Sequence, residues 1–266
     1  MLCILLLLAF ILTPRTRAGE IIRGHEAKPH SLPYMAYIEF TYATEIFACG
    51  GLLIHEQFVL TAAHCFDRDL ESQHEKTIIL LGAHNIKKHE KTQQSILVKE
   101  QFTHPHYNLP NNNDIMLLQL KEKAKLSKEV QILELPKRET RVMPGDLCQV
   151  AGWGLIDRKT LPDTLQEVEM TVQTDKECET RYANYNSATQ MCAGDPKLKK
   201  GAYDGDSGGP FICNNVVQAI VCFGNSKGIL YTKLSPYIDW IEKTMQHLLL
   251  QQANEASSLR NHQFMA

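Results

Sequence analysis

Short apolar or alternating segments recur along most of the chain and are separated by Gly, Asn and Pro. Segments of this length, bounded by turn-forming residues, are typical of antiparallel β-strands. They form two sets of about six, so the pattern predicts an all-β fold of two six-stranded antiparallel β-barrels, over about residues 34–120 and 147–233. The predicted strands are Tyr34–Phe40, Ile46–Ile54, Phe58–Ala62, Thr77–Leu81, Ser95–Lys99, Ile115–Leu120, Leu147–Trp153, Leu165–Val172, Gln190–Ala193, Pro210–Cys213, Val216–Phe223 and Ile229–Lys233.

Two segments favour helices instead. Thr174 and Glu177 form a capping-box pattern that predicts a short helix. Ser235-Pro236 predicts the N-cap and first turn of a second helix, over about residues 236–248. Its apolar face is expected to pack on the second barrel and consists of Ile238, Ile241, Met245 and Leu248. Residues 246–266 are mainly polar and predict a frayed or disordered tail.

The N-terminus has the pattern of a targeting segment. Residues 1–12 are almost wholly apolar, and residues 13–18 form a short polar stretch that ends in Ala18. This pattern predicts a secretory signal peptide of residues 1–18, with a buried N-terminal helix as the alternative. Neither this segment nor any later stretch is long enough to span a membrane, so a secreted protein without a membrane span is expected. Most of the eight cysteines should then be oxidised.

The strongest chemical signal is the run Gly205-Asp206-Ser207-Gly208-Gly209-Pro210. Glycines on both sides of Ser207 permit a tight turn, which would let the Gly205 and Ser207 amides point together at a negative oxygen. A serine alone is a weak nucleophile and needs a base with an orienting partner. The candidate base is His64, in Thr61-Ala62-Ala63-His64-Cys65, and the candidate partner is Asp114, in Asn113-Asp114-Ile115-Met116-Leu117-Leu118.

The order of these three residues and their flanking motifs resembles the chymotrypsin-type serine proteases. The resemblance covers residues 21 to about 245 and implies an active site in the cleft between the barrels. There His64 would take the Ser207 proton, Asp114 would hold the imidazole, and the amides of Gly205 and Ser207 would form the oxyanion hole. It implies an endopeptidase that hydrolyses protein or peptide substrates through an acyl-enzyme, with no cofactor and no metal. The chain has no CxxC or HExxH pattern, and His104-Pro105-His106 lies in a polar stretch, so this histidine pair is expected to be solvated, with a metal site as the alternative.

The dipeptide Gly19-Glu20 and the segment Pro29–Ala36 are similar to the granzyme and mast-cell protease branch of that family. This resemblance implies a zymogen from which residues 19–20 are removed, so that the new ammonium group of Ile21 pairs with buried Asp206. It also implies storage in leukocyte or mast-cell secretory granules, inhibition by serpin-type inhibitors and a monomeric enzyme. Arg23 stands where the branch usually has glycine.

The resemblance also implies three disulfides. Sequence alone permits many connectivities, and the family's pairs are Cys49–Cys65, Cys148–Cys213 and Cys178–Cys192. Cys222 is then left over. It is expected to be a small buried hydrophobic residue, the alternative being an intermolecular bridge or reactive thiol. It occupies the position at which the family usually has a serine that supports the catalytic aspartate.

The residues that correspond to the family's specificity pocket are Gly201, Ala202, Gly224 and Ile229. Gly201 replaces the acid of trypsin-like members, so Lys and Arg side chains would find no partner. Gly224 leaves the pocket mouth open, whereas the branched side chain of Ile229 should shorten the pocket. We therefore expect cleavage after Leu, Met or Val, with Phe and Tyr as the alternative.

Charge adds little to this interpretation. The chain has 28 basic and 30 acidic residues, a net charge of −2, which makes a weak case for proteoglycan binding and none for nucleic acid. The lysine clusters at 87–91 and 197–200 are expected to be solvated. A different class of function also stays open, a protease-fold binding protein with little or no catalysis.

Overall fold

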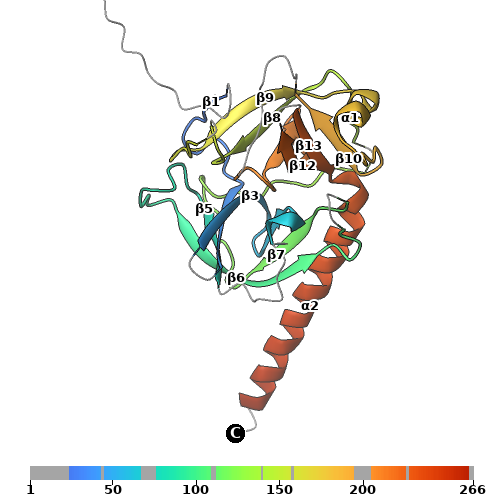
Figure 1. Ribbon diagram of the computed structural model, residues 1–266. Coiled ribbons are helices and arrows are strands. Elements are labelled where there is room, and N and C mark those ends of the chain that lie inside the picture. The colour runs from blue at the N-terminus through green and yellow to red at the C-terminus, as the bar shows by residue number, and fades with distance from the viewer. Residues whose placement is uncertain are drawn as a thin grey trace, which may run out of the picture.

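The computed structural model describes residues 24–42, 45–66, 76–108, 112–138, 140–156, 159–194, 205–225 and 228–263. Two β-structures lie side by side, and a long C-terminal helix runs along them and projects past the first (Figure 1). The predicted signal peptide and activation dipeptide lie outside the described residues. No helix among the described residues is long and apolar enough to cross a membrane.

The first β-structure is a closed barrel of six antiparallel strands in the order β2-β3-β4-β7-β6-β5. Alternate residues of one strand face its core, as in β2, where Ala36, Ile38 and Phe40 are almost completely buried. This barrel was predicted from the first set of about six short strand segments, which Gly, Asn and Pro separate. Its strands are β2 (Met35–Tyr42), β3 (Glu45–His55), β4 (Phe58–Thr61), β5 (Lys76–Leu81), β6 (Gln94–Thr103) and β7 (Met116–Leu120).

The second β-structure confirms the predicted class but not a closed six-stranded barrel. Its described strands form an open antiparallel sheet of seven, in the order β1-β9-β8-β11-β12-β13-β10. The additional strand, β1, pairs with one end of the free edge of β9. Just beyond the other end of β9, a single bridge between Val172 and Ala193 is the contact with β10 among the described residues, so the sheet does not close into a barrel. The strands are β1 (His25–Glu26), β8 (Leu147–Gly152), β9 (Gln166–Thr171), β10 (Gln190–Ala193), β11 (Pro210–Cys213), β12 (Val216–Asn225) and β13 (Gly228–Lys233).

The short helix α1 (Asp175–Arg181) begins as predicted. The Thr174 side chain accepts a hydrogen bond from the Glu177 amide, and the Glu177 carboxylate accepts one from the Thr174 amide. A 3₁₀ turn, η1 (Ala63–Cys65), follows β4. The start of α1 is thus fixed by local contacts, and η1 carries His64.

The C-terminal helix differs from its prediction in three ways. Ser235 makes no capping hydrogen bond, because the segment opens with a 3₁₀ turn, η2 (Ser235–Tyr237). Helix α2 (Ile238–Gln263) then continues far past residue 248, so the prediction of a disordered tail was wrong for these residues. Leu248 is buried and Leu249 partly buried in an apolar cluster that combines residues of both β-structures, so the helix packs on both and not on the second alone.

That shared apolar cluster also fixes how the two β-structures meet. It combines side chains of barrel one, of the seven-stranded sheet and of the η2–α2 segment. The following members are all buried: Leu52, Phe58, Leu60, Ile115, Leu117, Ile212, Val217, Ile220, Tyr237 and Ile241. Because interiors of this kind are close-packed, a shift of one β-structure against the other would open voids. The two β-structures are therefore held in a fixed relative position, which a site built from residues of both requires.

Candidate active site

His64 and Asp114 are in direct contact. The Asp114 carboxylate accepts a hydrogen bond from the His64 backbone N–H through Oδ1 at 2.8 Å, and its Oδ2 lies 2.7 Å from the His64 Nδ1. Asp114 is completely buried, whereas the His64 side chain is 28% exposed. A carboxylate fixed by two contacts to one residue holds both the backbone turn and the ring orientation of that residue.

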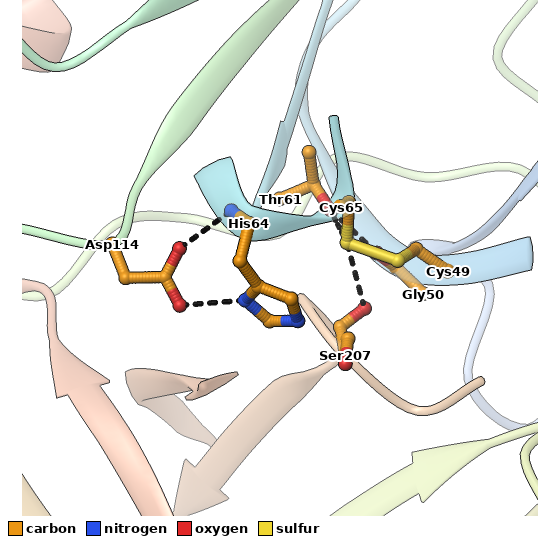
Figure 2. Close-up of polar contacts among 7 residues, drawn as sticks. All are labelled: Cys49, Gly50, Thr61, His64, Cys65, Asp114 and Ser207. Carbon is orange, nitrogen blue, oxygen red and sulfur yellow. Dashed lines mark hydrogen bonds and ion pairs between the residues drawn. A yellow bond between two sulfur atoms is a disulfide. The ribbon is translucent and has the colours of Figure 1, made fainter. Parts of the chain in front are cut away.

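Figure 2 shows one nitrogen of the His64 ring directed at the Asp114 carboxylate, while Ser207 lies on the other side of the ring. His64 comes from η1 and Asp114 from the turn before β7, both in barrel one, whereas Ser207 precedes β11 of the seven-stranded sheet. The structure thus brings together three residues that are 50 and 93 positions apart in the chain. Only the contact between the two β-structures makes this possible.

The Ser207 turn is tied to barrel one through its backbone. The Gly50 amide of β3 donates to the Ser207 carbonyl oxygen at 2.8 Å. Gly208 has φ of +79°, and a Cβ there would lie 2.1 Å from Thr61 Oγ1 and 2.6 Å from the Gly50 carbonyl oxygen. A side chain at this position is excluded both by backbone conformation and by lack of space.

Gly205 begins the turn with φ of +103°, in a region that favours glycine. The next residue, Asp206, is completely buried and its carboxylate accepts a hydrogen bond from the Gly154 amide at 2.8 Å. Its predicted partner, Ile21, lies outside the described residues.

The packing around Asp206 explains two glycines that sequence reasoning did not assign to the site. A Cβ on Gly152 would lie 2.1 Å from Asp206 Oδ1, and one on Gly154 would lie 2.5 Å from Asp206 Cγ. The Gly152-Trp153-Gly154 run is therefore shaped around a buried carboxylate. The two closely spaced glycines are visible in the sequence, but the carboxylate that they enclose lies 52 positions after Gly154 and could not be paired with them by pattern alone.

Two of the four predicted pocket residues are described. Ile229 in β13 is completely buried and is paired with Gly224 of β12 on one side and with Ala193 of β10 on the other. Gly224 is partly exposed. Gly201 and Ala202 lie outside the described residues, so the structure describes this candidate pocket through the strands β10, β12 and β13 alone.

The disulfides are Cys49–Cys65, Cys148–Cys213 and Cys178–Cys192, the pairs that the family resemblance implies. The first joins η1, which carries His64, to β3. Cys222 is an unpaired and buried thiol, as expected, and it hydrogen bonds to Asp114. Burial first, and then the charge of Asp114, raise the pKa of the Cys222 thiol well above its usual value.

No cluster of three or more His, Cys, Asp or Glu side chains that could hold a metal ion occurs within the described ranges. His104 lies against the rings of Tyr237 and Trp240, with 5.1 Å between ring centroids in each pair. His104 is therefore partly buried against η2 and α2 and is not fully solvated as expected, whereas His106 is exposed. Burial lowers the pKa of His104, and the neighbouring His106 lowers it further.

The sequence profile of the trypsin family, described as "Trypsin", matches residues 21–241, which is most of the chain and includes all three site motifs. The chain belongs to the trypsin family. It is similar to human granzyme H, with 51% identity over 249 residues, 92% of this chain and 98% of the relative. It is also similar to cathepsin G of Mus musculus, with 45% identity over 264 residues, 98% of each chain.

Among solved structures, one titled "Structure of GrC" superimposes with a TM-score of 0.79 at 44% identity and covers 85% of this chain and 99% of that chain. Relatives at this level of identity, over nearly their whole length, support a serine endopeptidase of the granzyme, cathepsin G and mast-cell protease group. The class predicted from the sequence motifs is confirmed.

Proposed function

We propose that this trypsin-family protease hydrolyses peptide bonds through His64, Asp114 and Ser207. The observation that carries the proposal is the buried Asp114 carboxylate 2.7 Å from His64 Nδ1, with Ser207 on the opposite side of the same ring. Because the contact with Asp114 favours a hydrogen on Nδ1, the other ring nitrogen is left as the proton acceptor.

In this mechanism the Ser207 oxygen attacks the substrate carbonyl while His64 takes its proton. His64 then returns that proton to the leaving amine, and the acyl-enzyme is hydrolysed by water with the same residue as base. Asp114 stabilises the charged imidazole that exists between the two transfers. The Gly205 and Ser207 amides donate hydrogen bonds to the negative oxygen that develops on the substrate. In enzymes with such a site, removing one donor raises the activation barrier by about 3–4 kcal/mol.

For specificity, we propose cleavage after medium apolar residues such as Leu, Met or Val, with Phe and Tyr as the second candidates. Support comes from Ile229, whose branched side chain is buried between β10 and β12, and from Gly201, which provides no negative charge for a Lys or Arg. Replacing Ile229 by glycine should lengthen the pocket and move the preference toward Phe and Tyr.

We further propose that the protein is secreted and granule-stored, and that it becomes active when residues 1–20 have been removed and Ile21 pairs with Asp206. The apolar N-terminus and Gly19-Glu20 support this route. Protein substrates and serpin-type inhibitors are the expected partners of a monomer. The near-neutral charge balance gives only weak support to proteoglycan storage.

The experiment uses the protein that begins at Ile21, labelled with a fluorophosphonate and then profiled on a peptide library. We expect stoichiometric labelling, its loss in Ser207→Ala, and cuts after Leu, Met or Val. Cuts after Phe or Tyr by the unmodified protein would keep the mechanism and refute the role given to Ile229. Folded protein that does not label would instead favour a protease-fold binding protein with little or no catalysis. The similarity of this chain to proteases does not favour that alternative.

A further inference from the structure

The residue before the candidate catalytic aspartate is held by both ends of its side chain. Asn113 has φ of +52°, a left-handed conformation that asparagine adopts more readily than most residues other than glycine. Its Nδ2 donates to the His106 carbonyl oxygen at 2.7 Å, and its Oδ1 accepts from the Tyr237 hydroxyl at 2.9 Å. The backbone turns at once, because the Ile115 amide donates to the Asn113 carbonyl oxygen at 2.8 Å.

The Tyr237 hydroxyl connects this turn to the other β-structure. Tyr237 is 3% exposed and lies in η2, after β13 of the seven-stranded sheet. While it donates to Asn113, its oxygen accepts from the Thr189 side chain, and Thr189 in turn accepts the Lys233 amide of β13 through its carbonyl oxygen. One hydroxyl thus spans from the Asp114 turn to the start of β10, a strand of the candidate pocket.

Two further observations indicate that the Tyr237 hydroxyl stays protonated and in place as a hydrogen-bond donor. Burial raises the pKa of Tyr237 to about 12, and the nearby charge of Asp114 also raises it. The hydroxyl therefore keeps its proton at every pH at which a histidine base works. The ring is held separately, by edge-on packing against His104 and by the apolar cluster between the β-structures.

We infer that Tyr237 is a positioning residue for Asp114: its hydrogen bond to Asn113 fixes the left-handed turn that aims the Asp114 carboxylate at His64. The inference rests on the proposed function of Asp114. Both carboxylate oxygens contact His64 at 2.7 and 2.8 Å, so a small rotation of the preceding residue lengthens one of these contacts. A buried carboxylate has no water with which to replace a lost contact.

The test is Tyr237→Phe in the full chain processed to Ile21, because this change removes the hydroxyl and keeps the ring. We expect kcat to fall about three- to tenfold, the usual range for one hydrogen bond, with KM unchanged. The acidic limb of kcat/KM against pH should move to lower pH, because a misaligned Asp114 stabilises the charged His64 less. Rates are normalised by active-site titration, so that loss of folded protein does not count as loss of activity.

The matched control is Tyr185→Phe, which removes another partly buried tyrosine hydroxyl, one that contacts the Asp175 carboxylate in α1 and the Gln190 carbonyl oxygen. It should leave kcat and the pH profile unchanged. A second variant, Asn113→Gly, tolerates the left-handed turn but has no side chain to hold it. If Tyr237 acts through Asn113, the double variant Asn113→Gly with Tyr237→Phe should be no slower than Asn113→Gly alone.

Tyr237→Phe with the kcat and the pH profile of the wild type would overturn the inference, as would fully multiplicative effects in the double variant. A wild type that does not label with fluorophosphonate, or a Ser207→Ala variant that retains activity, would refute the proposed function instead. The two failures are distinguishable because the first is measured on Tyr237 and Asn113 variants and the second on the wild type and Ser207→Ala.

Discussion

Replacing Cys222 tests how the buried aspartate is held. The thiol is 2% exposed and hydrogen bonds to the Asp114 carboxylate. Because burial and the charge of Asp114 raise the pKa of this thiol, it keeps its proton and acts as a donor. The other two contacts of Asp114 are the His64 backbone N–H at 2.8 Å and the His64 Nδ1 at 2.7 Å.

Cys222→Ala removes one of these three contacts. Leaving a buried acceptor without a donor costs about 1–3 kcal/mol, and we expect the lower part of this range, about 1–2 kcal/mol, because Asp114 keeps two contacts. At about 1.4 kcal/mol for each factor of ten, kcat/KM should fall about 5- to 30-fold. Cys222→Ser keeps a donor, and a hydroxyl is a better donor than a thiol, so its kcat/KM should stay within about threefold of the wild type or exceed it.

The assay is kcat/KM on the best library peptide, with enzyme concentration set by active-site titration and folding checked by thermal unfolding. An Ala variant as active as the wild type would refute the reasoning, because the thiol would then contribute nothing to the orientation of Asp114. A Ser variant as slow as the Ala variant would show that the volume of the sulfur, and not its hydrogen bond, is what the site requires.

Three further predictions follow from burial and close approach. The Cys222 thiol should resist a thiol reagent such as DTNB in the native protein and react fully in denaturant, because it is buried with a raised pKa; fast native reaction would contradict its burial. Gly154→Ala should lower thermal stability by about 1–3 kcal/mol and slow fluorophosphonate labelling, because its Cβ would lie 2.5 Å from Asp206 Cγ; unchanged stability and labelling would count against this packing. A chain that ends at Leu250 should unfold close to the wild-type temperature, whereas one that ends at Lys243 should lose about 2–4 kcal/mol with the burial of Leu248; equal stability of the two would refute the packing of α2.

Much of the fold could be read from short-range patterns. The segments Gln190–Ala193 and Pro210–Cys213 were predicted to the residue, because both are buried and mainly apolar and are followed by the turn-forming residues Gly194 and Asn214. Strand β1 was missed, since two exposed residues carry no pattern and pair only because β9 offers an open edge. The packing of α2 on both β-structures was also missed, because the apolar surface of barrel one that it contacts is distant in sequence.

The sequence by itself determined which residues are chemically able to act. Small residues around Ser207, a histidine beside a cysteine and an aspartate at the start of a strand are local patterns, and they identified His64, Asp114 and Ser207 as the candidate residues. The tertiary structure alone decided that Asp114 is buried against His64, that Gly152 and Gly154 enclose Asp206, and that the Tyr237 hydroxyl reaches Asn113. The physical reason is that local patterns specify which faces are apolar, whereas hydrogen bonds between distant residues depend on how those faces pack together.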